Sequence, residues 1–194
     1  MGKIVMSGPQ NVTLDGVVQD PDGEEGFELG GWFKQFGGKD LQQWTEVALA
    51  DALGAEAWLL GRRSYEFFGV RWRGRSGDLA DRLNTIPKYV VSSTLVEPDW
   101  TNSRVITGDV VTEVSKLKQE LDGEIVVPGS YQLGRVLMEH DLVDELRLVV
   151  FPVVLGAGER LFGANCDSKP LRLVGTKTIG DSLAFLTYQL ARDV

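Results

Sequence analysis

Stretches with different hydrophobic patterns alternate along this chain and predict strands and helices in turn. Short, largely apolar runs are typical of buried strands, and they fall at residues 3–7, 57–60, 88–92, 104–106 and 124–127. Apolar residues at helical spacing predict helices between these runs, over residues 41–53, about 65–68, 78–83, 110–121 and about 129–139. This order predicts an α/β fold with a mainly parallel sheet and helices on both of its faces.

The last quarter of the chain has a different pattern. Residues 142–155 form a long apolar run that is too rich in β-branched residues for a helix, and residues 171–178 and 182–190 predict a hairpin around Gly180 and Asp181. We therefore expect the sheet to end in antiparallel strands. Residues 8–38 are rich in Gly, Asp and Pro and predict an irregular stretch, which is long enough to be partly structured or functional. No linker or repeat divides the chain, so we expect one domain over residues 1–194.

Composition narrows the function classes. Hydrophobic residues make up 43% of the 194 residues and charged residues 25%, which is typical of a globular protein. The net charge of −8 argues against nucleic acid and anionic membranes as partners. Cys166 is the only cysteine, so no intrachain disulfide can form, and a reducing, cytoplasmic setting is expected. With one histidine as well, a Cys/His metal site is not expected.

One strand-to-helix turn concentrates positive charge in this acidic chain. Gly61 permits a tight exit from the apolar strand, and Arg62, Arg63 and Ser64 stand where the helix begins. The start of a helix offers unpaired backbone N–H groups, and guanidinium groups add bidentate recognition of phosphate. The basic stretch continues through Arg71, Arg73 and Arg75. The turn therefore predicts a site for a phosphorylated small molecule; the alternative is a solvated helix end with surface arginines.

Two further strand ends carry similar features. Gly129, Ser130 and Tyr131 follow the strand at 124–127 and begin a helix, while Ser92, Ser93 and Thr94 follow the strand at 88–92. Each alone is also typical of an ordinary cap or turn. Because ligands of open α/β sheets bind at the carboxyl ends of the strands, the three turns together indicate one ligand with several phosphates, a dinucleotide. The chain has no GxGxxG fingerprint, so the Rossmann turn is not expected.

These segments, taken together and in order, resemble a known family. The segments are Thr13-Leu14-Asp15-Gly16, the turn at residues 59–66, the strand and turn at 88–93, Gly129-Ser130, and residues 152–162, which read PVVLGAGERLF. The combination is similar to the dihydrofolate-reductase-like family that includes the reductase domain of the riboflavin-biosynthesis deaminase/reductase. The resemblance spans residues 3–190 and implies a three-layer fold, a mainly parallel central sheet with an antiparallel C-terminal hairpin, and an NADPH-dependent oxidoreductase.

The resemblance also implies roles for individual residues. Arg62 and Arg63 would meet the adenosine 2′-phosphate, with Ser64 on the pyrophosphate. The adenosine side would contact Ser92, Ser93 and Thr94, and the pyrophosphate would contact the turn of Gly129, Ser130 and Tyr131. Asp15, Gly16 and Val17 would lie beside the nicotinamide ribose. A homodimer through the C-terminal strands is implied as well, and exposed strand edges favour it independently.

The substrate side of the family pattern is less complete. The acidic helix residue of dihydrofolate reductases has no counterpart here, which argues against folate reduction. Hydride transfer needs a proton for the partner atom, and Asp15 and Glu159 are the candidate donors. The alternatives are a simple Asp-Gly turn for Asp15 and a solvated pair with Arg160 for Glu159. Cys166 has no activating neighbours in sequence, so a nucleophile is not expected.

The expected function is NADPH-dependent reduction of a small heterocycle, most specifically a ribosylamino-pyrimidine. We expect the substrate between residues 26–36 and 152–162, with Lys34 or Arg160 available for a substrate phosphate. The zinc signature of the deaminase half, which needs several cysteines, is absent. Two alternatives stay open: a non-catalytic NADP-binding sensor or interaction protein, and a dihydrofolate or pterin reductase.

Overall fold

The protein, described by a computed structural model for residues 1–163 and 167–191, is built around one eight-stranded sheet. The strand order is β4-β3-β2-β5-β1-β6-β8-β7. Six neighbouring strands, from β4 to β6, are parallel; β8 runs antiparallel to β6, and β7 pairs only with β8. The strands are β1 (Lys3–Thr13), β2 (Ala55–Gly61), β3 (Lys88–Val91), β4 (Ser103–Ile106), β5 (Glu124–Pro128), β6 (Glu145–Phe151), β7 (Leu171–Ile179) and β8 (Leu183–Leu190).

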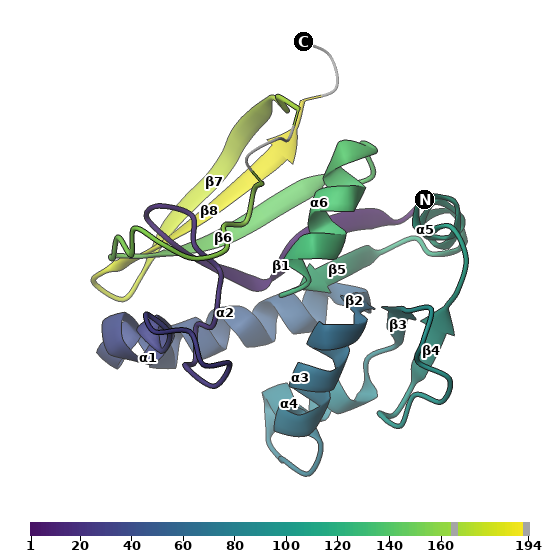
Figure 1. Ribbon diagram of the computed structural model, residues 1–194, viewed down its shortest axis with the longest axis horizontal. Helices are drawn as coiled ribbons and strands as arrows, with labels where there is room; N and C mark the ends of the chain where they lie inside the picture. Colours follow the sequence, from purple (N-terminus) through teal and green to yellow (C-terminus); the bar gives the residue numbers. More distant parts are fainter. Residues whose placement is uncertain (164–166, 192–194) are drawn as a thin grey trace.

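Helices cover both faces of the sheet, which completes the expected three layers (Figure 1). One face carries α5 (Val110–Glu120) and α6 (Tyr131–Glu139). The opposite face carries α1 (Trp32–Gly37), α2 (Leu41–Gly54), α3 (Arg62–Trp72) and α4 (Asp78–Thr85), with the short 3-10 turn η1 (Gly38–Asp40) before α2. The α/β class, the mainly parallel sheet and the antiparallel C-terminal hairpin are confirmed.

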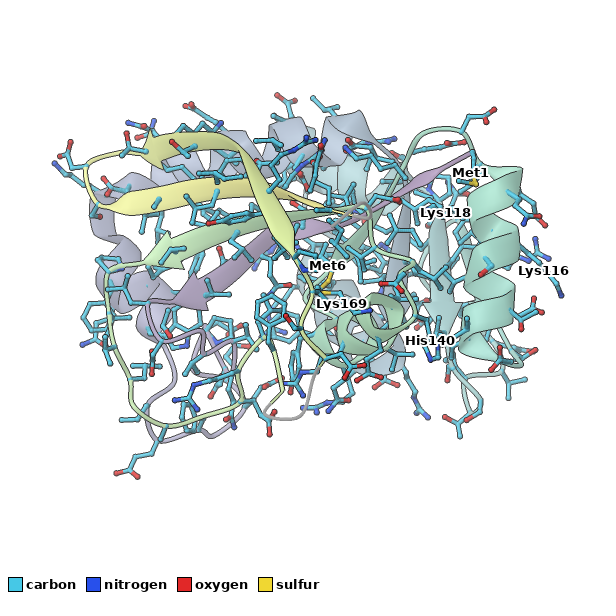
Figure 2. All side chains as sticks on the ribbon, turned by 90° about the horizontal axis from the view of Figure 1, so that it is seen from above. Met1, Met6, Lys116, Lys118, His140 and Lys169 are labelled. Carbon is cyan, nitrogen blue, oxygen red and sulfur yellow. The ribbon has the colours of Figure 1, made fainter. Side chains whose placement is uncertain are left out.

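Successive side chains along the central strands point to opposite faces of the sheet, and this divides the hydrophobic core into two parts. On β1, Ile4 and Met6 pack with α5 and α6, whereas Val5 packs with α2 to α4. Met6 lies in the middle of the molecule, while Lys116 projects from the outer side of α5 (Figure 2). Helix α6 approaches so closely that a Cβ at Gly134 would overlap the methyl group of Met6. This tight packing fixes the start of α6 over the end of β5.

The prediction of an irregular stretch over residues 8–38 is wrong at both ends of that range. Strand β1 continues to Thr13, and residues 32–37 form α1. The strand accommodates Gly8 and Pro9 because it bends there. The pairing register with β6 shifts between Met6 and Gln10, and Gly8 adopts a φ of 103°. A Cβ on Gly8 would overlap Pro128, so the bend holds β1 against the end of β5. Only the central part of the stretch is a true loop.

Among the residues that the structure describes, no helix is long and apolar enough to cross a membrane.

Candidate functional site

The site is built on two helix starts that the sheet places side by side. Helix α3 follows β2, and α6 follows the adjacent strand β5 (Figure 1). The Gly61 N–H donates a hydrogen bond of 3.0 Å to Ser130 Oγ, which in turn donates to the Pro128 carbonyl at 3.1 Å. Neither helix has a side-chain hydrogen bond at its N-cap. Two sets of free backbone N–H groups therefore meet at one place, which is the arrangement that binds a pyrophosphate.

Position 129, at the start of α6, lies so close to α3 that it favours glycine. Gly129 has a φ of 59°, and a Cβ there would lie 3.3 Å from the ring of Phe68 and 3.9 Å from Ser64 Oγ. The structure thus brings together Gly61, Ser64, Gly129 and Ser130, which the sequence places in two separate turns. A side chain at position 129 would crowd the Phe68 ring and would be strained at this positive φ.

Arg62 leads from the helix start into a pocket at the ends of β3 and β4. The pocket has a volume of about 370 Å³ and is lined by Arg62, Val91, Ser92, Ser93, Thr94, Ile106, Gly108 and Val110. Its apolar members suit a flat base, and its hydroxyls and guanidinium suit a ribose phosphate. The start of α5, also at this pocket, is already capped because Asp109 accepts from the Thr112 N–H. Arg62 is therefore the one positively charged side chain in this pocket lining.

The guanidinium of Arg62 is oriented by two neighbours. Its Nε donates to Glu66 Oε1 at 2.7 Å, and its Nη1 donates to Thr94 Oγ1. Ser92 Oγ accepts from the N–H groups of Thr94 and Leu95, so this side chain holds the turn. Ser93 is exposed at the pocket.

Arg63 has a different position from Arg62. It does not line the pocket, its side chain is 73% exposed, and Glu25 lies 4.0 Å from its guanidinium.

The later arginines, at the end of α3 and just after it, do not extend this positive site, contrary to the expectation of one continuous basic region. Arg71 binds Asp22 at 2.6 Å and also Glu24, and Arg73 binds Asp99. Arg75 lies over the ring of Trp72. Acidic residues that are distant in sequence pair with Arg71 and Arg73, so of these three arginines only Arg75 has no ion pair within the described chain.

Asp15 occupies the turn after β1 and is held by many hydrogen bonds. Thr13 Oγ1 donates to Asp15 Oδ1 at 2.6 Å, and the Leu155 and Gly156 N–H groups donate to the carboxylate at 3.2 and 2.9 Å. Partial burial raises the pKa of Asp15, but these hydrogen bonds outweigh it and leave the pKa below its usual 3.8. An ionised carboxylate with three donors is suited to joining two loops rather than to releasing a proton.

Gly16 and Val17 continue this junction. The Gly16 carbonyl accepts from the Leu161 N–H at 2.8 Å, and Val17 is fully buried and bridged to Arg160. Arg160 Nε donates to the Asp15 carbonyl at 3.0 Å. The loops at residues 13–19 and 153–161 therefore form one unit next to the end of β1.

Glu159 meets Arg135 of α6 at this unit. Glu159 Oε2 lies 3.4 Å from Arg135, and the Glu159 side chain is 55% exposed. Arg135 also donates to the carbonyls of Arg160 and Leu161, and its guanidinium lies 5.2 Å from the ring of half-buried Tyr131. Glu159 is thus paired with Arg135 and not with Arg160.

Sequence reasoning missed Arg135 as the residue that joins α6 to the loop at 159–161. Its only sequence signal is its place one helical turn after Tyr131. Lys34 is exposed, and Cys166 lies outside the described residues.

Comparisons with known proteins agree with this architecture. The chain is 28% identical over 185 residues to "Uncharacterized protein YyaP" of Bacillus subtilis (strain 168), which covers 91% of this chain and 90% of that protein. The structure matches a putative riboflavin biosynthesis protein from Shewanella sp. PV-4 with a TM-score of 0.72 and 21% identity, over 98% of this chain and 99% of that one. It also matches dihydrofolate reductase from Enterococcus faecalis complexed with NADP(H), with a TM-score of 0.60 and 17% identity, over 100% and 97% of the two chains.

The family comparison is decisive because it spans most of the chain. The model of the RibD C-terminal domain matches residues 10–185, from the second half of β1 into β8. The matched range includes every strand end and turn that forms the site. The chain therefore belongs to the RibD C-terminal domain family.

Proposed function

We propose that this protein is an NADPH-dependent reductase of a small heterocyclic substrate, most specifically a ribosylamino-pyrimidine. The observation that carries the proposal is the pair of uncapped helix starts, α3 and α6, which meet at Gly61 and Ser130 beside an arginine-lined pocket. The likeness to a dihydrofolate reductase complexed with NADP(H) and to a putative riboflavin biosynthesis protein supports the same cofactor and substrate class.

The site suggests how the cofactor would lie along the sheet. The adenosine and its 2′-phosphate would occupy the pocket with Arg62, and the pyrophosphate would bind the amides after Gly61 and Gly129. The nicotinamide half would then extend across the end of β1 toward the loop unit of Asp15 and Glu159. Bound there, NADPH supplies a hydride, and the chain's own residues supply position, charge complementarity and a proton.

Of the two candidate proton donors, Glu159 fits the role better than Asp15. The Asp15 carboxylate accepts three hydrogen bonds and has a lowered pKa, whereas Glu159 is half-exposed and has only a long contact with Arg135. We propose that Glu159, or a water molecule that it holds, delivers the proton. Asp15 would instead keep the loop unit in place.

The same observation supports the second candidate function, a non-catalytic NADP-binding sensor. A sensor needs the phosphate site but no proton donor, and Asp15 has the environment of a structural carboxylate. Dihydrofolate reduction has less support, because the first turn of α2 carries no acidic residue and Asp40, just before it, binds the β7–β8 turn.

Calorimetry with NADPH and NADH is the first test. We expect NADPH to bind more tightly by roughly 1.5–3 kcal/mol, on the order of 10- to 150-fold, because a 2′-phosphate adds a charge-assisted contact. Equal affinity for the two nucleotides would contradict the proposal.

Turnover assays then separate the candidates. NADPH oxidation with a ribosylamino-pyrimidine would support the reductase. Efficient turnover of dihydrofolate would contradict the substrate class. Tight NADPH binding without oxidation by any pyrimidine, pterin or quinone would favour the sensor.

A further inference from the structure

The turn after β1 and the loop that carries Glu159 are joined by a short antiparallel pairing. Val17 is bridged to Arg160. The Val18 N–H donates to the Glu159 carbonyl at 2.8 Å. The side chain of Gln19 adds a further hydrogen bond to this pairing, because its Oε1 accepts from the Glu159 N–H at 2.9 Å. Gln19 therefore binds the backbone of the residue that we propose as the proton donor.

Gln19 is itself anchored to the hydrophobic core. Its backbone carbonyl accepts from the indole N–H of Trp32 at 2.9 Å. Trp32 is fully buried, and its ring packs edge-on against Phe151, with the ring centroids 5.3 Å apart. A continuous series of contacts thus runs from the core through Gln19 to Glu159.

The segment before Glu159 is conformationally permissive. Residues 156–158 read Gly-Ala-Gly, and both glycines adopt a positive φ, 80° at Gly156 and 114° at Gly158. A backbone of this kind has many conformations open to it in the unfolded chain, and ordering it costs entropy. The position of Glu159 therefore depends on the hydrogen bonds that hold its own N–H and carbonyl.

The side chain of Glu159 is only weakly held. It is 55% exposed, and its contact with the guanidinium of Arg135 is 3.4 Å long. The backbone of Glu159 therefore largely decides where the carboxylate lies. This matters for catalysis, because a reacting group displaced by about 1 Å can slow a reaction by roughly 100-fold.

We infer that Gln19 is a positioning residue for the reaction, which fixes Glu159 relative to the core so that its carboxylate can deliver a proton to the substrate. The inference rests on the proposed function, because Glu159 has this role only if the protein is a reductase. Glutamine suits the position, since its amide oxygen accepts the Glu159 N–H without adding a second negative charge beside the carboxylate.

The test compares Gln19→Leu with the control Gln43→Leu in the full-length protein. Gln43 Oε1 also accepts from a backbone N–H, that of Gly180 at 3.0 Å, so the control loses the same kind of bond at the turn between β7 and β8. The measured quantity is the single-turnover rate of NADPH oxidation with 5-amino-6-(5-phosphoribosylamino)uracil. We expect Gln19→Leu to react about fivefold more slowly, since one neutral hydrogen bond is lost, and Gln43→Leu to react at the wild-type rate. The affinity for NADPH, measured by calorimetry, should be unchanged in both variants.

A double-variant cycle separates positioning from a general structural role. Glu159→Gln should react more slowly than the wild type, because its side chain has no proton to deliver. Adding Gln19→Leu to Glu159→Gln should cause no further loss, since the group that Gln19 positions is already disabled. A structural role would instead give the same loss in both backgrounds.

Amide hydrogen exchange of the ligand-free protein gives a readout that needs no turnover. The Glu159 N–H should exchange faster in Gln19→Leu than in the wild type, because it has lost its acceptor. Unchanged exchange, an unchanged rate in Gln19→Leu or in Glu159→Gln, or an equal loss in both backgrounds would overturn the inference. A wild type that binds NADPH but does not oxidise it with this pyrimidine would instead overturn the proposed reaction.

Discussion

Single residues in this protein owe their roles to partners from distant parts of the chain. Arg62 and Arg63 are adjacent in sequence, but only Arg62 lines the pocket. Arg63 is largely exposed beside Glu25. The two arginines therefore form a matched pair of variants for testing which of them binds the 2′-phosphate of the proposed cofactor.

Replacing Arg62 by alanine should weaken NADPH binding by roughly 10- to 100-fold and leave NADH binding nearly unchanged, since a charge-assisted contact is worth about 1.5–3 kcal/mol. Arg63→Ala is the control, and we expect a change of less than about threefold. Calorimetry with both nucleotides measures the effect. A large loss confined to Arg63→Ala would mean that Arg63 binds the phosphate.

Lys88 is a buried charge with a predictable titration. Its ammonium group donates to the carbonyls of Ile86 and Thr101 at 2.9 and 3.0 Å and lies 4.3 Å from the ring of Trp100. Burial, together with the charge of nearby Arg82, lowers the pKa of Lys88 to about 8. The unfolded chain therefore holds the proton on Lys88 to a higher pH than the folded protein does.

Because the unfolded state binds more protons between pH 8 and 10.5, Lys88 should make the protein more stable as the pH rises through that window. Urea unfolding at several pH values, compared with Lys88→Met, isolates this contribution. The wild type should gain stability relative to Lys88→Met between these pH values. A constant difference between the two proteins would show that the pKa of Lys88 is not lowered.

At the scale of elements, a partly buried ion network joins three strands to α2. Arg147 on β6 donates to Asp51 of α2 at 2.8 Å, to Glu124 of β5 at 2.6 Å and to Glu145 at 2.7 Å. Lys3 of β1 binds Glu145 at 2.6 Å. Burial raises the pKa of Glu145, but the contacts with Lys3 and Arg147 outweigh it and leave the pKa below its usual 4.5.

Arg147→Met should lower the free energy of unfolding by about 3–5 kcal/mol, because it leaves carboxylates buried without their partner. Lys116→Met, which breaks an exposed pair on α5, is the matched control and should have little effect. The difference between wild type and Arg147→Met should shrink as the pH falls below 4.5, where protonation of Glu145 removes its contribution. Denaturant unfolding at neutral and acidic pH measures both effects.

At the scale of the whole molecule, the sheet ends in β7, whose outer edge pairs with no strand of the described chain. Strand β7 pairs only with β8, and Leu173 and Val174 on it are 49% and 45% exposed. An edge strand of nine residues that exposes two apolar side chains favours association with another chain. We propose that a second copy binds here and that the protein is a homodimer.

Light scattering at micromolar concentration should give the mass of a dimer, and Val174→Lys should shift the protein toward the monomer while the circular dichroism spectrum stays unchanged. The reason is that a lysine on an edge strand opposes strand pairing. Lys177→Ala, on the same strand, is the control and should not shift the protein toward the monomer, because it removes a lysine from the edge. A monomeric mass for the wild type would contradict this proposal.

The sequence by itself determined the order of most strands and helices and the turns that begin α3 and α6. Apolar periodicity and the glycines at 61 and 129 are local features, and local features suffice to predict where a strand ends and a helix starts. Parallel order of the strands then implied that the turns share one edge of the sheet. The meeting of Gly61 with Ser130 follows from that order.

Only the tertiary structure decided how these residues are used. Asp15 accepts from Gly156, 141 positions away, and Arg71 meets Asp22, 49 positions away, so neither partner can be read from local sequence. The bend of β1 depends on Gly8 fitting against Pro128, which carries Gln10 past the end of β5. Charge pairing and strand register are set by packing between distant segments, and packing decides which polar groups remain free for a ligand.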